Sequence, residues 1–232
     1  MKKRQFYALI LAAGLLMHSC YAVNKLGNYD FREKTLAADF EMDPFIDHLV
    51  IEKEEADESQ FTIVNILNDA KSLLTDAETL LIAARVDSAM RELNVPEYVT
   101  GQMLRKGSEI LDMNITEDRV NADFMFKVRF EEYRLESTSY ESDVFLVYNI
   151  IVTMVDIKTG ANVWRIQESG SEKLDVSTLA SEAAFLLDAK VITLFDLETE
   201  EIVGGMRTNA DHLVEKILSK LQIDLTTSRN KN

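Results

Sequence analysis

Few side chains in this sequence are spaced for acid–base or nucleophilic chemistry. Beyond position 20 the only histidines are His48 and His212, and each is expected at the surface or at an element boundary rather than as a base. No glycine-rich phosphate loop and no nucleophile elbow occurs. Forty acidic residues make chance carboxylate pairs unavoidable, so a carboxylate-dependent hydrolase stays open without any residue being assigned to it. We predict no catalytic residue and no cofactor.

One short acidic alternation is a candidate metal site. Asp39, Glu41 and Asp43 place carboxylates at every second position, as the first part of a calcium-binding EF-hand loop does. Pro44 follows directly, and the glycine that such a loop needs is missing. We therefore predict no metal site.

A turn and a tryptophan supply the candidate interaction residues. The segment Asp156-Ile-Lys-Thr-Gly160 has the composition of a tight turn, in which Gly160 can adopt φ > 0 and the Asp156 side chain caps the turn itself. Trp164 is the only tryptophan. We expect it in the core, although half-exposed tryptophans also anchor interfaces. The candidates for contact with a partner are Asp156, Thr159, Gly160 and Trp164.

This turn belongs to a hairpin around which the chain is organised. Residues 144–155 are rich in β-branched and aromatic side chains, contain no glycine or proline, and have Asn149 and Thr153 as their main polar members. They predict a long strand with cover on both faces, or with a partner on one. Residues 162–167 alternate between two faces and predict the returning strand.

Residues 122–135 predict a third strand whose parity changes. One extra residue near Glu131-Glu132 would restore the register, which predicts a β-bulge there. A short apolar run at 48–51 predicts a further strand, whereas 61–67 fits a helix and a strand equally well. The apolar side chains that change parity are Phe124, Phe126, Val128 and Phe130, followed by Tyr133 and Leu135.

Two amphipathic helices precede these strands. Residues 76–93 have apolar side chains at helical spacing after a capping box that begins at Thr75, and the Val95-Pro96 pair ends that helix. Pro96 starts a second helix, 96–111, in which Gly101 and Gly107 each cost up to about 1 kcal/mol relative to alanine.

The C-terminal third contains an echo of the central turn. Residues 192–199 match 152–159 in kind, with Asp196 in the place of Asp156, and predict a second strand, turn and strand. Residues 177–187 predict a helix before it. A final helix is expected after Gly204-Gly205, capped by Thr208.

Composition and the N-terminus indicate where the protein acts. The formal charge of −15 in 232 residues disfavours nucleic-acid binding, because so acidic a surface repels phosphate backbones. Lys2-Lys-Arg4 precedes an apolar run at 6–17. As a helix this run would span about 18 Å, too little for a bilayer core of about 30 Å. It predicts a secretory signal peptide, 1–19.

The only cysteine, Cys20, follows this leader and has two interpretations. Leu16-Met-His-Ser-Cys20 resembles a bacterial lipoprotein box, which implies that Cys20 becomes the acylated N-terminus, carrying palmitate or similar fatty acids. Alternatively, Cys20-Tyr-Ala22 is a small-x-Ala cleavage site, and cleavage would remove the cysteine. We favour acylation, because the mature chain otherwise contains no cysteine at all. In either case no disulfide within the chain is possible.

These elements predict one α/β domain, a mostly antiparallel sheet with a long central hairpin packed against amphipathic helices in a sandwich-like arrangement. The expected organisation is a lipid-anchored flexible tether at 20–40, the domain at 41–225 and a disordered tail at 226–232. We expect attachment to the bacterial envelope, on the outer membrane facing the periplasm, and a role in protein contact. A periplasmic small-ligand binder is a further alternative.

The region 121–174 resembles a family of known proteins. Ala122-Asp-Phe-Met-Phe126, then a long strand that ends in Val155-Asp-Ile-Lys-Thr-Gly160 and continues to Val163-Trp164, is similar to a pattern in penicillin-binding-protein activator and curli-export lipoproteins. The resemblance implies an α/β sandwich on a lipid anchor that acts by protein contact rather than catalysis. The partners that we expect are an envelope protein and, as an alternative, further copies of the same chain. The two consecutive helices before this region depart from the family's usual opening of strand, helix and strand.

Overall fold

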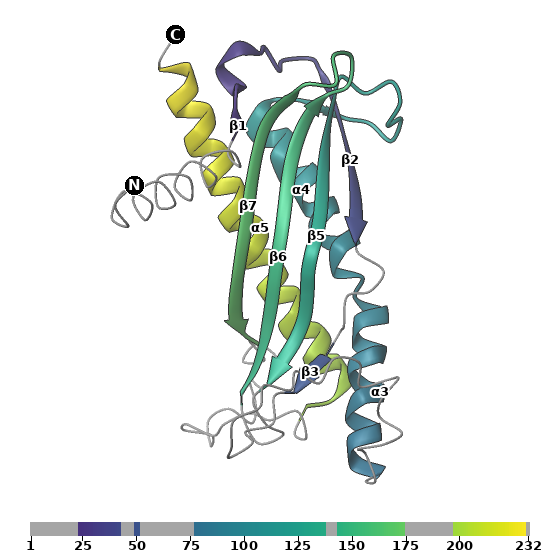
Figure 1. Cartoon of the computed structure of the whole chain (residues 1–232). Helices are drawn as coiled ribbons and strands as arrows, with labels where there is room; N and C mark the ends of the chain where they lie inside the picture. Colours follow the sequence, from purple (N-terminus) through teal and green to yellow (C-terminus); the bar gives the residue numbers. More distant parts are fainter. Residues whose placement is uncertain (1–22, 43–48, 52–76, 138–142, 175–196, 231–232) are drawn as a thin grey trace, which may run out of the picture.

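A computed structural model describes residues 23–42, 49–51, 77–137, 143–174 and 197–230 of the chain (Figure 1). The elements run in the order β1 (Val23–Asn24), η1 (Leu26–Asn28), β2 (Thr35–Met42), β3 (Leu49–Ile51), α3 (Ala77–Glu92), α4 (Val95–Leu111), β4 (Asn114–Ile115), β5 (Phe124–Ser137), β6 (Val144–Asp156), β7 (Asn162–Lys173) and α5 (Thr199–Arg229).

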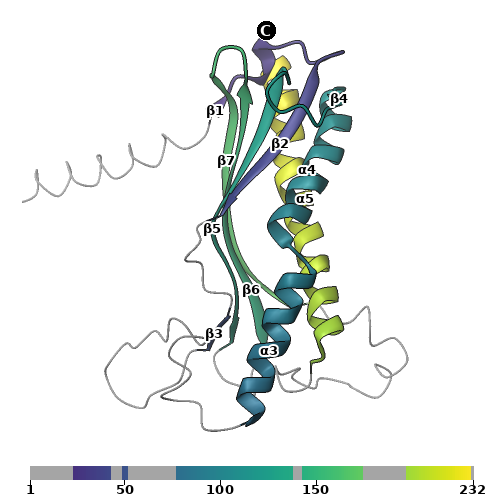
Figure 2. The same cartoon turned by 90° about the vertical axis from the view of Figure 1, so that its right-hand side faces the viewer.

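The strands form one seven-stranded mixed sheet, in the order β1-β7-β6-β5-β2-β4, with β3 also paired to β5. β5, β6 and β7 are an antiparallel meander, whereas β2 and β3 lie parallel to β5. Helices α3, α4 and α5 form a second layer on one side of the sheet (Figure 2). The predicted α/β class, the single domain and the long central hairpin are confirmed.

The predicted register change in β5 is confirmed as well. Pairing with β6 shifts between Phe130 and Glu132, so that Phe130 and Tyr133 both face the helices although their parities differ. Their rings meet edge to face, with centroids 6.3 Å apart. The bulge therefore keeps the aromatic side chains of a fourteen-residue strand on the buried face.

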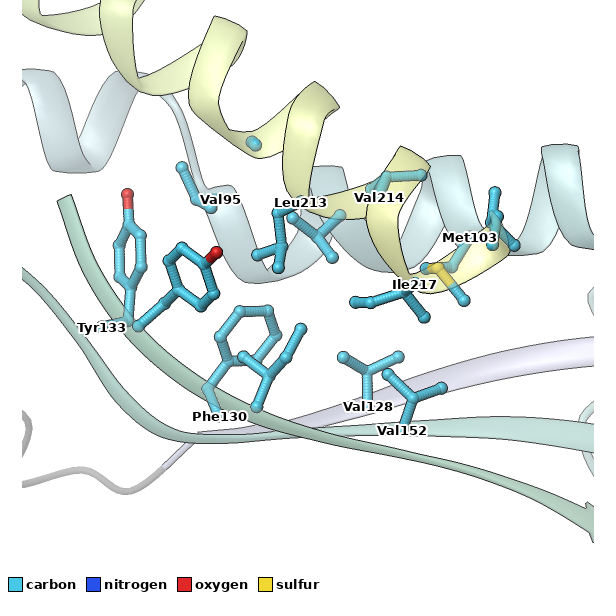
Figure 3. Packing of buried hydrophobic residues seen from close by; sticks show 14 of the residues in the cluster. Val95, Met103, Val128, Phe130, Tyr133, Val152, Leu213, Val214 and Ile217 are labelled. Atoms are coloured by element: carbon cyan, nitrogen blue, oxygen red, sulfur yellow. The ribbon is translucent and has the colours of Figure 1, made fainter. Parts of the chain in front are cut away.

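The core lies between the sheet and the helix layer (Figure 3). Val128 and Val152 from the sheet face Leu213, Val214 and Ile217 from α5, and all five side chains are buried. Burying a side chain of this kind stabilises the fold by roughly 1.5–3 kcal/mol. The faces of β5 and β6 that were expected to be apolar are thus the faces that the helices cover.

Gly107 explains how α4 approaches the sheet so closely. A Cβ atom at this position would lie 2.6 Å from Cε2 of the Phe126 ring. Close packing of α4 on β5 therefore offsets the helix propensity lost at Gly107.

The expectation of a flexible tether at 20–40 is wrong for the residues that the structure describes. β1 and β2 are strands of the sheet, and Leu26, Phe31 and Leu36 are almost completely buried. The Phe31 ring lies edge to face with Phe124, with centroids 5.2 Å apart. The folded domain therefore begins at β1 rather than at residue 41.

The expectation for the C-terminal helix needs correction at both ends. α5 starts at Thr199, before the two glycines, and its N-cap Glu198 forms a capping box with Glu201. The second half of the expected repeat, from 199 on, is therefore helix and not strand. Thr208 does not cap the helix, since its hydroxyl donates to the Gly204 carbonyl inside it. Residues 226–229, expected in the tail, continue α5.

The expected helix at 76–93 corresponds to α3, the helix at 96–111 to α4, and the apolar run at 48–51 to β3. The capping box at Thr75, the ambiguous segment 61–67, the helix at 177–187 and the strand beginning at 192 lie outside the described residues, as do Cys20 and His48. His212 is exposed on α5, as expected of a surface residue.

Candidate interaction surface

The β6–β7 turn has the structure that its sequence predicts. The Asp156 carboxylate accepts hydrogen bonds from the backbone N–H groups of Lys158, at 2.9 Å, and Thr159, at 3.2 Å. Gly160 has φ +69°, a conformation that glycine adopts without strain. Asp156, Thr159 and Gly160 therefore lie together in one turn, and Asp156 caps it.

Trp164 is not an exposed anchor. Its side chain is completely buried, and its Nε1–H donates to Oδ2 of Asp224 on α5 at 2.8 Å. The indole thus links β7 to α5, and the expectation that Trp164 lies in the core is confirmed.

Asp123 is a connecting residue whose role the sequence did not reveal. Its carboxylate accepts hydrogen bonds from the Thr35 backbone N–H at 3.0 Å and from the Lys158 ammonium at 2.8 Å. The hydrogen bond from Lys158, followed by that from the Thr35 backbone, lowers the pKa of Asp123 to about 2. The Asp123 carboxylate thus links β2, the start of β5 and the β6–β7 turn. Thr35 and Lys158 are both distant from Asp123 in the sequence. The only sequence feature that indicates a role for Asp123 is its position at the start of a strand.

Helices α3, α4 and α5 leave one face of the sheet uncovered (Figure 2). The strand register places many polar side chains on that face. We call this surface the open face. Because side chains alternate across a strand, its members pair across the sheet, for example Lys127 with Asp39 on β2 and with Thr153 on β6. Its charged residues are Asp39, Glu41, Lys127, Arg129, Glu131, Glu132, Arg134, Glu136, Arg165 and Lys173. Both signs are thus mixed on this face, in a chain whose net charge is −15.

A ladder of hydrogen bonds orders the centre of the open face. The Gln167 side-chain amide on β7 donates to Oδ1 of Asn149 on β6 at 2.9 Å, and Asn149 in turn donates to Oε2 of Glu131 on β5 at 3.2 Å. Arg129 lies 3.7 Å from the other carboxylate oxygen of Glu131. These exposed side chains hold one another in place, which reduces the entropy that a binding partner must remove.

Two apolar side chains of β6 also belong to the open face. Ile151, opposite Arg129 and Gln167, is 6% exposed, and Val155, opposite Met125 and Asn162 near the β6–β7 turn, is 7% exposed. Arg134 pairs with Glu132 and, at 2.9 Å, with Glu136. The part of the open face that solvent reaches is therefore polar and charged, and its apolar side chains are themselves largely buried.

A polar cluster lies between β7 and α5 on the other side of the sheet. Glu168 is buried and binds the ammonium groups of Lys216, at 2.6 Å, and Lys220. The Tyr148 hydroxyl donates to Oε1 of Glu172 at 2.8 Å. In the sequence, only the spacing of Lys216 and Lys220, which share a helix face, points to this cluster.

The pKa values in this cluster favour fixed charges. Burial tends to raise the pKa of Glu168, but the hydrogen bonds from Lys216 and Lys220 outweigh it and lower that pKa. The hydrogen bond to Glu168 raises the pKa of Lys216. Burial, together with the bond to Glu172, raises the pKa of Tyr148 to about 12. A general acid or base works best with a pKa near neutrality, so these pKa values suit a structural ion pair better than proton transfer.

A hollow of about 500 Å³ lies at the end of the molecule where η1, α4 and α5 meet. Its charged lining residues are Asp30, Arg32, Asp112 and Arg229.

Within the described ranges, no group of three or more histidine, cysteine or acidic side chains is placed to hold a metal ion. Likewise, no described helix is both long enough and apolar enough to cross a membrane.

No family model matches the sequence, and no curated protein matches it. Among solved structures, the fold is similar to a protein of family DUF330 from Xanthomonas campestris, with 5% identity over 87% of this chain and 90% of that one, at a TM-score of 0.44. It is also similar to PelC from Paraburkholderia phytofirmans, a dodecamer, with 16% identity, 80% and 91% coverage and a TM-score of 0.29.

A third similar structure is the lipoprotein GNA1162 from Neisseria meningitidis, with 12% identity over 66% of this chain and 93% of that one, at a TM-score of 0.25. Similarities at these TM-scores do not establish a shared function. The resemblance of region 121–174 to penicillin-binding-protein activator and curli-export lipoproteins stays a prediction.

Proposed function

We propose that this protein is a bacterial envelope lipoprotein, acylated at Cys20 and held on the outer membrane facing the periplasm, that acts by protein contact through the open face of its sheet. Acyl chains in the number that a bacterial lipoprotein carries hold a protein firmly on a membrane. The basic residues, apolar run and serine-cysteine pair at the N-terminus support the anchor. The polar ladder across β5, β6 and β7 carries the interaction proposal.

The ladder supports a contact surface because it orders exposed side chains without covering them. Glu131 and Gln167 are exposed, yet each is hydrogen-bonded to Asn149. A partner that docks here meets groups already in position, around Ile151, which is opposite Arg129 and Gln167. Turnover of a substrate is a weaker explanation. Where the fold shifts the pKa of a described carboxyl group, it lowers that pKa, as in Asp30, Asp118, Asp123 and Glu168. A carboxyl acting as a general acid needs a raised pKa instead.

The anchor is tested by expressing the full chain and its Cys20→Ser variant in a bacterial host. We expect the first to partition into detergent and to carry a diacylated or triacylated Cys20 by mass spectrometry, whereas the variant stays in the aqueous phase. A mature N-terminus at Val23 without modification would overturn the lipoprotein proposal.

The contact surface is tested by site-specific photo-crosslinking in cells. A photoreactive residue replaces Arg129 on the open face, and the control replaces Arg105 on the outer side of α4, whose side chain is exposed to a similar extent, 55% against 62%. We expect a protein adduct of defined mass at position 129 that is lost when Glu131 and Asn149 are both changed to alanine. Equal adducts at both positions, or none at 129, would contradict the proposal.

The hollow beside η1 favours a second candidate, a periplasmic small-ligand binder. Its two arginines and two aspartates could hold the charged groups of a zwitterionic molecule. Titration of the purified protein with amino acids and short peptides, followed by its melting temperature, separates the two functions. A rise in melting temperature that disappears in Arg229→Ala would favour the ligand binder.

A further inference from the structure

β7 forms the edge of the sheet over most of its length. β1 covers only its first part, where Asn24 pairs with Trp164 and Val23 with Arg165. At the other end, the Asn209 side-chain amide on α5 donates to the carbonyl oxygens of Glu172, at 3.3 Å, and Lys173, at 3.0 Å. Between these covered ends, residues 166–171 have no strand on their outer side among the described residues.

The pairing with β6 shows which backbone groups point outward. The Leu174 N–H donates to the Val144 carbonyl, so even-numbered residues of this part of β7 make the hydrogen bonds to β6. The backbone N–H and C=O groups of Gln167, Ser169 and Ser171 therefore point away from the sheet. Such a row of groups is a template for another strand.

The side chains along this edge do not obstruct pairing. Ser169 and Ser171 are small, Gly170 has no side chain, and no proline or lysine lies between 166 and 172. Natural edge strands commonly carry proline or lysine, which prevent another strand from pairing with them. The charge of Glu168 is compensated by Lys216 and Lys220. Glu172 accepts a hydrogen bond from the Tyr148 hydroxyl and keeps its charge.

We propose that β7 pairs antiparallel with β7 of a second copy of this chain, about a two-fold axis at Ser169, and so joins two sheets edge to edge. In this register Ser169 faces Ser169, Glu168 faces Gly170 and Gln167 faces Ser171. No two like charges lie directly opposite one another, as a stable antiparallel pair requires. A C₂ dimer with the same patch on both subunits is also the commonest form of association.

The covered ends fix the length of this contact. The residues whose backbone groups point outward, Gln167, Ser169 and Ser171, are centred on Ser169. One step further, Lys173 would face Arg165, which already pairs with Val23 of β1. The pairing therefore stops where two like charges would meet. The inference rests on the proposed function, a role in protein contact, and names one partner, but it uses the edge of the sheet and not the open face.

The test is disulfide trapping in the full chain with Cys20→Ser, which leaves no native cysteine. Opposite residues of a hydrogen-bonded antiparallel pair have Cα atoms about 5.5 Å apart, within the range of about 4.4–6.8 Å that a disulfide needs. Ser169→Cys should therefore give a disulfide-linked dimer under mild oxidation. Ser171→Cys is the matched control on the same strand and face. The two introduced cysteines would lie about 14 Å apart along the strands, so this variant should form no disulfide link between subunits.

Sedimentation of the Cys20→Ser chain without further substitution should give twice the monomer mass. Adding Ser169→Lys should reduce the measured mass to that of the monomer, because it places two ammonium groups opposite each other. Ser169 is exposed, so this variant should keep the melting temperature of the monomer. A chain that sediments as a monomer, or equal trapping by Ser169→Cys and Ser171→Cys, would overturn the dimer. If Ser169→Lys abolishes the dimer but leaves photo-crosslinking at position 129 intact, the dimer and the open-face contact are separate interactions.

Discussion

The two faces of strand β6 show how one strand can serve two purposes. On the helix side, Leu146, Ile150, Val152 and Met154 are at most 1% exposed and belong to the hydrophobic core. On the open side, Asn149 and Thr153 alternate with Ile151 and Val155, and hydrogen bonds between side chains run across the sheet. The helix side of β6 is uniformly apolar and buried, whereas the open side mixes buried apolar residues with hydrogen-bonded polar ones. We therefore expect substitutions on the two faces to separate stability from binding.

The largest effect is expected from truncation on the helix side. Ile150→Ala should lower the free energy of unfolding by about 2–5 kcal/mol, because it leaves a cavity beneath α5. Thermal unfolding followed by circular dichroism measures this. Thr153→Ala, on the other face of the same strand, is the control and should change stability by less than about 0.5 kcal/mol. Equal losses in the two variants would mean that the open face is also covered in the folded protein.

Gly107→Ala adds a methyl group where α4 meets the sheet. Its Cβ would lie 2.6 Å from the Phe126 ring, which must then shift. We expect a loss of about 1–3 kcal/mol from overpacking, although alanine is the better helix former. Gly101→Ala is the matched control, since nothing lies within 4 Å of a Cβ there, and it should stabilise the protein slightly. A stabilised Gly107→Ala would show that the ring moves aside at no cost.

Asp123 should make stability depend on pH in the acid range. Its pKa falls from 3.8 to about 2 on folding, so the carboxylate stabilises the fold fully above about pH 4 and loses this effect as the pH falls through 2. A tenfold change in the acid dissociation constant corresponds to about 1.4 kcal/mol. Because Lys158 is largely exposed, we expect only about 1–2 kcal/mol in urea unfolding. Asp123→Asn should lose this amount at pH 6 but little at pH 2. An equal loss at both values would assign the effect to packing.

The sequence predicted what depends on neighbouring residues and missed what depends on distant ones. The β5 bulge and the positive φ of Gly160 follow from side-chain parity and turn composition over a few residues. The contacts of Asp123 with Thr35 and Lys158, and of Glu168 with α5, join segments that no local pattern connects.

The errors have the same origin. Leu26, Phe31 and Leu36 show no helical or strand period, yet each is buried in the core, so the segment was expected to be a tether. The two glycines of α5 suggested a helix boundary. The Glu198–Glu201 capping box and the burial of Ile202, Val203 and Met206 outweigh their poor helix propensity.

The smallest effect on stability, and the most informative one for function, is expected at Asn149. Its amide links Gln167 to Glu131 on the open face and is not part of the core. Exposed hydrogen bonds of this kind contribute about 0.5–1.5 kcal/mol at most, so Asn149→Ala should shift the melting temperature by only a few degrees, roughly 2–4 °C for each kcal/mol. If the ladder orders a contact surface, the same variant should weaken photo-crosslinking at position 129 strongly, because Glu131 and Gln167 lose the residue that holds them. Asn121→Ala, in the loop before β5, removes an exposed hydrogen bond to Asp118 instead and should leave crosslinking unchanged. Equal crosslinking in both variants would mean that the ladder serves only the sheet.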